Sequence, residues 1–235
     1  MTLPYDFYTL ASYLAAGFFF IPIVLIACRN LFRNKLLLWF SVYWLWSGLI
    51  NILCSLEVLN DTFALNIIER LYNLVDIPLL LFIMYKTTQI ESIKKNLQKV
   101  LLPLTVLEIG VLAVTRFSTG METALVFCGV VIVLFYIIWT IIKYSNNASF
   151  KNSSISYQYI YYALLFGYAT SIITVIYSYM LPQKANNDDN FLVFHISTII
   201  AIATASAGIL TYHEEKAIPK TKKSNFSAGP EIRYL

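Results

Sequence analysis

Seven apolar runs, each about as long as a helix that crosses a bilayer, constrain the fold of this chain more than any other feature. A transmembrane helix needs roughly 20 consecutive, mainly apolar residues. The runs lie near Phe7–Cys28, Leu37–Leu59, Thr62–Tyr85, Val100–Phe117, Thr123–Tyr144, Tyr157–Met180 and Phe191–Tyr212. Of the 235 residues, 58% are hydrophobic and only 13% are charged. We therefore predict an all-α membrane domain over residues 1–212, a seven-transmembrane-helix bundle that leaves no room within these residues for a soluble catalytic domain.

Lysine and arginine gather in alternate connections between the runs, and in the tail. These basic residues are Arg29, Arg33, Lys35, Lys86, Lys94, Lys95, Lys99, Lys143, Lys151, Lys216, Lys220, Lys222, Lys223 and Arg233. The opposite connections carry only Arg116 and Lys184. Connections rich in basic residues remain in the cytoplasm. We predict an odd number of spans, an outside N-terminus and a cytoplasmic C-terminus, in the cytoplasmic membrane of a bacterium.

The tail over residues 213–235 is polar, basic and contains Pro219 and Pro230. Such a composition cannot bury enough apolar surface to fold, so we predict a disordered cytoplasmic segment. Its lysines follow the last span directly and would be attracted to anionic lipid head groups. The expected partners are therefore the lipid bilayer, and anionic lipids at the tail, and we expect no nucleic-acid partner.

The third apolar run carries a polar stripe, the most informative pattern in the chain. At 100° per residue, Asn66, Glu69, Asn73 and Asp76 fall on one narrow face of a helix, with Tyr72 at its edge. Carboxylates at membrane depth are costly, so they usually face the bundle interior or water and often mark a site. Two readings remain open, a functional site or a hydrogen-bonded network that fixes helix packing.

Other ionisable or polar residues extend this pattern into two layers. Counting about 1.5 Å per residue from the helix ends places Arg70, Asn51 and His195 at the depth of Glu69, in the outer half. Asp76 lies deeper, near the level of Glu108. We therefore predict an outer layer that is reachable from outside and an inner carboxylate pair. Which of these residues are lateral neighbours does not follow from depth alone.

No metal site is predicted. Cys28, Cys54 and Cys128 lack metal-type spacing, and His213 lies about 27 Å along the same helix from His195. His195 is read as a hydrogen-bonded structural residue or as a group that responds to protons or ligand. In the same run, Ser197, Ala201 and Ala205 recur at four-residue spacing, which predicts close packing against a neighbouring helix.

The run from Arg70 through Asp76 and Pro78 into three leucines resembles the third helix of microbial rhodopsins, where an arginine and a counterion carboxylate precede a proline. Aligned on Pro78, the family's arginine falls on Glu69 and its counterion on Tyr72. The resemblance implies the seven-helix arrangement alone. No lysine occurs between Phe191 and Tyr212, where a retinal Schiff base needs an amine. We therefore predict no retinal and no other cofactor.

Three classes of function fit these patterns. The favoured one is a sensor or binding module for a small ligand or for protons, which acts through a separate cytoplasmic or membrane partner protein. The second is a small-solute or proton-coupled transporter that uses Asp76 and Glu108, because intramembrane carboxylates often relay protons. The third is an intramembrane enzyme that acts on a lipid-like substrate with a carboxylate pair. A scaffold subunit of a larger assembly is the remaining alternative.

Overall fold

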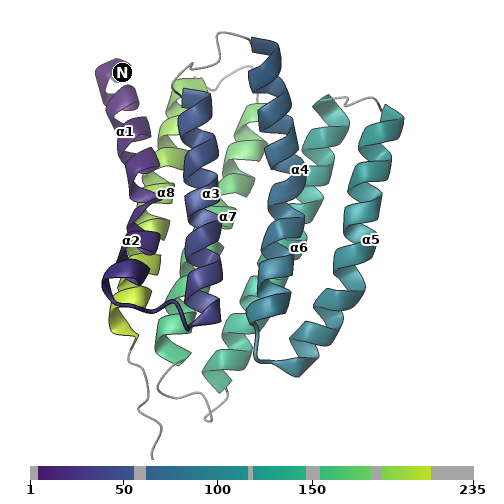
Figure 1. Cartoon of the computed structure of the whole chain (residues 1–235). Coiled ribbons are helices and arrows are strands. Elements are labelled where there is room, and N and C mark those ends of the chain that lie inside the picture. Colours follow the sequence, from purple (N-terminus) through teal and green to yellow (C-terminus); the bar gives the residue numbers. More distant parts are fainter. Residues whose placement is uncertain (1–4, 56–61, 116–118, 147–153, 181–186, 213–235) are drawn as a thin grey trace, which may run out of the picture.

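The computed structural model describes residues 5–55, 62–115, 119–146, 154–180 and 187–212, apart from some side chains near the helix ends. All regular structure in these ranges is helical, and the helices stand side by side as one bundle (Figure 1). They are α1 (Tyr5–Phe18), α2 (Ile21–Cys28), α3 (Lys35–Ser55), α4 (Thr62–Thr87), α5 (Glu91–Thr115), α6 (Thr119–Asn146), α7 (Ser154–Met180) and α8 (Asn187–Thr211). The tail over 213–235 lies outside the described residues.

The first predicted span is not one continuous helix. It is divided into α1 and α2, with Phe19 and Phe20 between them. Pro22 explains the break, because in a continuous helix its ring would clash with the carbonyl group of Phe18, where α1 ends. In the first turn of α2, where Pro22 lies instead, the missing N–H group is not needed. Both parts pack against α3 and α8, so α1 and α2 together form one rod of the bundle.

Helix α5 begins well before the predicted fourth span. Lys94, Lys95 and Lys99 were expected in a connection, but they lie on the first turns of α5. Between Glu91 and Lys99 the chain contains no proline or glycine, and Glu91 complements the positive end of the helix dipole. The connection between α4 and α5 is therefore short, and its Thr88 hydroxyl accepts a hydrogen bond from the N–H group of Ile90.

The closely packed part of the bundle lies toward the end at which α2 finishes and α3 begins. Its fully buried side chains include Leu37 and Phe40 of α3, Leu81 and Met84 of α4, and Tyr161 of α7. Helix α7 packs against α6 and α8, and α3 lies between the first rod and α4. Helix α5 stands at the edge of the bundle, against α4 and α6 (Figure 1).

At the same end, Arg29 joins the end of α2 to the end of α8. Its Nη1 atom donates to the carbonyl groups of Ile209 and Leu210, at 2.5 and 2.8 Å, and Nη2 donates to that of Tyr212 at 3.0 Å. The last carbonyl groups of a helix have no partner within it, so this guanidinium group caps α8 from another helix. The ring of Tyr212 also stacks on Tyr157 of α7, with ring centroids 6.2 Å apart.

Four helical stretches among the described residues are long and apolar enough to cross a membrane. They are Leu10–Cys28, Lys35–Leu53, Thr123–Asn146 and Leu192–Thr211. The chain thus has the helices of a membrane protein, in agreement with the class predicted from the sequence.

Candidate functional site

A cavity of about 250 Å³ lies between the helices, on the side of the closely packed core that is nearer the start of α8. Its wall is formed by Phe19, at the break between α1 and α2, and by residues of α3, α4, α6, α7 and α8. The lining residues are Phe19, Tyr43, Trp44, Ser47, Asn51, Tyr72, Asn73, Asp76, Ile77, Val126, Val130, Ala163, Leu164, Gly167, Tyr168, Ser171, Phe194, Thr198, Ala201 and Ile202. Helix α5 contributes no residue to this wall.

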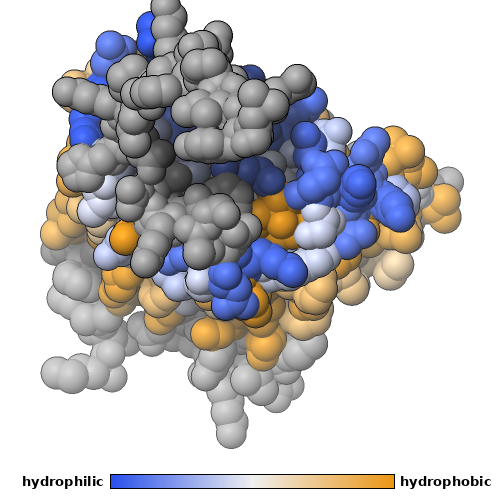
Figure 2. Space-filling view, turned by 90° about the horizontal axis from the view of Figure 1, so that it is seen from below, coloured by the Kyte–Doolittle hydropathy of each residue, from blue (hydrophilic) through white to orange (hydrophobic). Residues whose placement is uncertain are grey.

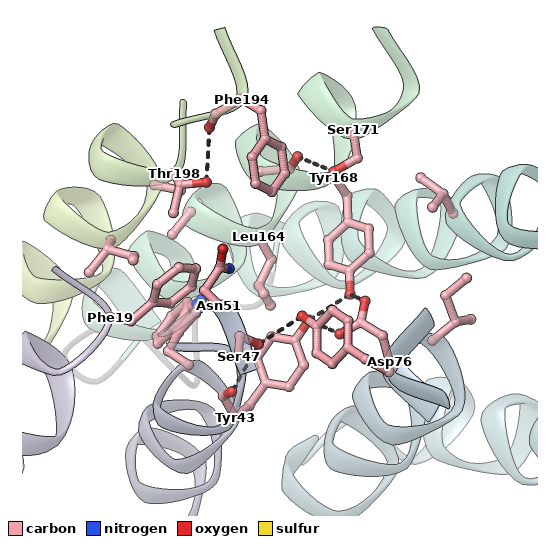
Figure 3. Close-up of a pocket in the computed structure, with 18 of the residues that line it drawn as sticks. Phe19, Tyr43, Ser47, Asn51, Asp76, Leu164, Tyr168, Ser171, Phe194 and Thr198 are labelled. Carbon is pink, nitrogen blue, oxygen red and sulfur yellow. Dashed lines mark hydrogen bonds between the residues drawn. The ribbon is translucent and has the colours of Figure 1, made fainter. Parts of the chain in front are cut away.

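The carboxyl group of Asp76 is the centre of a hydrogen-bond cluster in the cavity wall (Figure 3). Its Oδ1 atom lies 2.7 Å from the hydroxyl of Tyr43 on α3, and its Oδ2 atom lies 2.7 Å from the hydroxyl of Tyr168 on α7. The two tyrosine hydroxyls are also 2.7 Å apart and hydrogen-bonded to each other. Both tyrosines are buried, so three different helices meet at one carboxyl group.

A second chain of hydrogen bonds runs beside this cluster. The hydroxyl of Tyr72 donates to Oγ of Ser47 at 3.1 Å, and that of Ser47 donates to the backbone carbonyl of Tyr43 at 3.1 Å. These two hydrogen bonds connect α4 to the turn of α3 that contains Tyr43. Since Tyr72 lies one helical turn before Asp76, both residues present polar groups to α3.

The remaining polar part of the wall is made of amides and hydroxyls. Asn51 and Asn73 contribute side-chain amides. Ser171 donates its hydroxyl proton to the carbonyl of Gly167 at 3.0 Å, and Thr198 donates to that of Phe194 at 2.9 Å (Figure 3). These hydroxyls therefore offer lone pairs, so that toward the cavity they act as acceptors, whereas the amides both donate and accept.

Small residues decide where the helices touch and where space remains. Gly48 of α3 admits Phe19, because an added Cβ at Gly48 would lie 2.5 Å from Cβ of Phe19. Gly167 of α7 lies against Ala201 of α8, because a Cβ built at Gly167 would be in ordinary contact with that of Ala201, at 3.9 Å. These two small residues and the ring of Phe19 all form part of the cavity wall.

The structure places the eight predicted site residues in different surroundings. Asn51, Tyr72, Asn73 and Asp76 line the cavity. Glu69 lies on α4, but its side chain is outside those that the structure describes.

The other three predicted residues do not line the cavity. Arg70 is half-buried and His195 is buried on α8, with the ring of Phe194 5.9 Å from its own. Glu108 of α5 is buried, and its Oε2 atom has no hydrogen-bond partner among the described residues. The cavity therefore does not bring the predicted inner pair together: Asp76 lines it, whereas Glu108 lies on α5, which contributes no lining residue.

Three residues of the cluster were not singled out as site residues from the sequence: Tyr43, Ser47 and Tyr168. A signal for the first two exists, since Tyr43, Ser47 and Asn51 recur every four residues along a mainly apolar helix. Tyr168 belongs to a helix so rich in tyrosine that its position carries no signal. Within the described ranges, no three His, Cys, Asp or Glu side chains gather in a way that could hold a metal ion.

Comparison with known proteins adds no relative: no family model, no curated protein and no solved structure matches this chain.

Proposed function

We propose that this chain is a membrane protein of seven spanning rods that binds a small molecule in the central cavity, as a sensor that acts through a separate partner protein. Four of the rods meet the length and apolarity of a span on their own. The other three, α4, α5 and α7, expose apolar faces. On α5 the side chains of Leu102, Val106 and Val114 are 71%, 62% and 84% exposed. Lipid is the surrounding that makes such faces favourable.

The charge distribution supports an outside N-terminus. The described lysines, together with Arg29 and Arg33, lie at the end of the bundle that contains the α2–α3 and α4–α5 connections. Figure 2 views this end, where hydrophilic residues gather on the face and apolar residues form the sides. In the proposed orientation this is the cytoplasmic end, by the preference of basic connections for the cytoplasm.

The observation that carries the binding function is the cavity with Asp76 in its wall. Ligand sites are typically apolar and aromatic hollows with a few fixed polar groups, and here the rings of Phe19, Trp44 and Phe194 line the cavity together with the polar cluster. A cavity of about 150 Å³ accommodates benzene. In proportion, about 250 Å³ holds a molecule of about ten non-hydrogen atoms.

Thermal stabilisation of the purified protein tests this function. A panel of monocyclic aromatic and short-chain amphipathic compounds of about ten non-hydrogen atoms is added to the protein in detergent. A compound present at 100 times its dissociation constant stabilises the folded state by about 2.7 kcal/mol, which raises the melting temperature measurably. We expect some compounds of the panel to do so.

Two alanines of α8 provide a matched pair of variants. Ala201 lines the cavity, whereas Ala203 is exposed on the outer face of the same helix. Ala201→Leu should abolish the stabilisation by the compounds, and Ala203→Leu should preserve it. A panel without any stabilising compound, or equal stabilisation of both variants, would contradict the proposed site.

A transporter is the second candidate, and the break between α1 and α2 favours it. Interrupted spanning helices often mark the substrate site of transporters, and Phe19 at this break lines the cavity. Flux separates the two functions. A compound that stabilises the protein but does not cross the membrane of reconstituted vesicles supports sensing, whereas saturable uptake of that compound supports transport.

A further inference from the structure

We propose that the ring of Asp76, Tyr43 and Tyr168 is a proton-binding site, in which Asp76 is held as a neutral carboxylic acid. The inference concerns the regulation of the proposed cavity and rests on the proposed function only where it links the proton to the ligand. Its basis is the number of protons that the three hydrogen bonds require.

Three oxygen-to-oxygen contacts of 2.7 Å close the ring: Tyr43 to Asp76, Tyr168 to Asp76, and Tyr43 to Tyr168. This distance is that of an O–H···O hydrogen bond, and each such bond contains one proton. The two tyrosine hydroxyls supply two protons, and an ionised aspartate supplies none. With both tyrosines donating to the carboxylate, their own two oxygens would face each other at 2.7 Å without a proton between them. A protonated Asp76 supplies the third proton and completes the ring.

Neighbouring groups do not change this count. The Ser47 proton is donated to the backbone carbonyl of Tyr43, and the Tyr72 hydroxyl donates to Ser47. Neither proton lies on an edge of the ring, since each edge joins only two of its three members. The missing proton must therefore belong to Tyr43, Tyr168 or Asp76. Each tyrosine hydroxyl has only the one proton already counted, so the third proton is bound to Asp76.

Among the side chains that the structure describes, the other residues that line the cavity around the ring are uncharged. Besides the ring itself, Tyr72 is the titratable residue in the cavity wall, and the wall contains no lysine, arginine or histidine. Helices α6 and α8 face the cavity with Val126, Val130, Phe194, Thr198, Ala201 and Ile202. The ionisable groups Arg70 on α4, Glu108 on α5 and His195 on α8 lie outside the wall. Asp76 is partly buried, and a carboxylate withdrawn from water without a cation beside it is costly, a cost that a bound proton removes.

Loss of the proton has a defined structural consequence. The Oδ–H bond of Asp76 breaks, and the proton passes to water in the cavity. Both tyrosines then donate to the carboxylate, so the contact between Tyr43 and Tyr168 loses its hydrogen bond and its oxygens repel. Since Tyr43 lies on α3 and Tyr168 on α7, the two helices separate at the cavity wall. Proton binding and ligand binding in the cavity are then linked, and each changes the affinity for the other by the same factor.

Infrared spectroscopy of the ligand-free protein in lipid nanodiscs tests the protonation directly. The C=O stretch of a carboxylic acid is distinct from that of a carboxylate, and ¹³C-labelled aspartate shifts the band of aspartic but not of glutamic acid. At neutral pH the wild-type protein should show a carboxylic-acid band that the label shifts and that Asp76→Asn removes. Absence of a label-sensitive acid band in the wild-type protein would overturn the proposal. The measurement contains no ligand, so a failed binding experiment leaves its result unaffected.

Tyrosine variants test the ring itself. After Tyr43→Phe or Tyr168→Phe the ring is open, but Asp76 should stay protonated, because the carboxylate has lost a hydrogen-bond donor and has gained no cation. Each variant should therefore retain the acid band at neutral pH at a shifted frequency, since the acid group has lost one of its two hydrogen-bond partners. Tyr161→Phe is the control, because it removes a buried tyrosine hydroxyl of α7 that lies outside the cavity wall, and it should leave the band unchanged. An unchanged band in both ring variants would show that the ring does not hold the proton.

Discussion

The contact between Gly48 and Phe19 predicts that one added methyl group will separate α1 and α2 from α3. In Gly48→Ala the new Cβ would lie 2.5 Å from Cβ of Phe19 and 3.2 Å from its Cγ. Ordinary contact begins at 3.4 Å. The Cβ atom of Phe19 is bonded to the backbone and cannot rotate away, so the break between the two helices must move by about 0.9 Å, the difference between these distances.

Overpacking of this kind costs about 1–3 kcal/mol. Alanine in a helix interior is more favourable than glycine by about 1 kcal/mol, so the net loss in the free energy of unfolding is about 1 kcal/mol. Gly110→Ala in α5 is the control, because nothing lies within 4 Å of its added Cβ, and it should gain up to about 1 kcal/mol. Gly129→Ala should fall between them, since the atom 2.4 Å from its added Cβ is the terminal methyl group of Ile77, which can rotate.

Chemical unfolding in mixed micelles measures the three free energies. The opposite signs expected for Gly48→Ala and Gly110→Ala make the comparison independent of the absolute stability. Gly48→Ala should also weaken binding of the compounds that stabilise the wild-type protein, because Phe19 lines the cavity. A gain in stability for Gly48→Ala equal to that for Gly110→Ala would refute the close contact and the reasoning built on it.

Two further predictions concern the end of the bundle that contains the α2–α3 and α4–α5 connections. Arg29→Lys preserves the charge but cannot reproduce the three bonds of the guanidinium group to the end of α8, so it should lower the free energy of unfolding by about 1–2 kcal/mol and accelerate amide hydrogen exchange near Tyr212. Exchange there at the wild-type rate would show that Arg29 does not cap α8. Single cysteines at Lys94 and Lys151 should react with an impermeant thiol reagent only from the cytoplasmic side, and labelling of either from outside in intact cells would reverse the proposed orientation.

The part of the site on α4 was predictable because one helix determines it. A period of 3.6 residues places Asn73 and Asp76 on the same face, with Tyr72 at its edge, and membrane burial makes that face point inward. The partners of Asp76 were not predictable, because they lie on α3 and α7, and no pattern within one helix states which helices are its neighbours. Depth along the membrane suggested Glu108 as a partner, yet α5 stands at the edge of the bundle.

The position of His195 and the break in the first span are the other differences. On α8 the cavity is lined by Phe194, Thr198, Ala201 and Ile202. His195 is buried on the same helix but is not a lining residue, and depth along the helix did not predict this. The break before α2 could have been predicted from the sequence, because Pro22 is incompatible with a continuous helix from Phe7 to Cys28. Hydropathy alone does not register a proline, and the run was therefore read as one span.

The size of the cavity itself supports a function for it. Protein interiors are close-packed and contain few voids larger than a water molecule, so a cavity of about 250 Å³ between packed helices is unusual. Ala201 was predicted to pack against a neighbouring helix, and it lies against Gly167 of α7 at the cavity wall. A larger side chain at Ala201 would extend into the cavity. Because stability is commonly sacrificed at functional sites, we expect Ala201→Leu to melt at a higher temperature than the ligand-free wild-type protein while it loses the response to ligand. A lower melting temperature would show that the space is already filled by neighbouring side chains and is not a binding cavity.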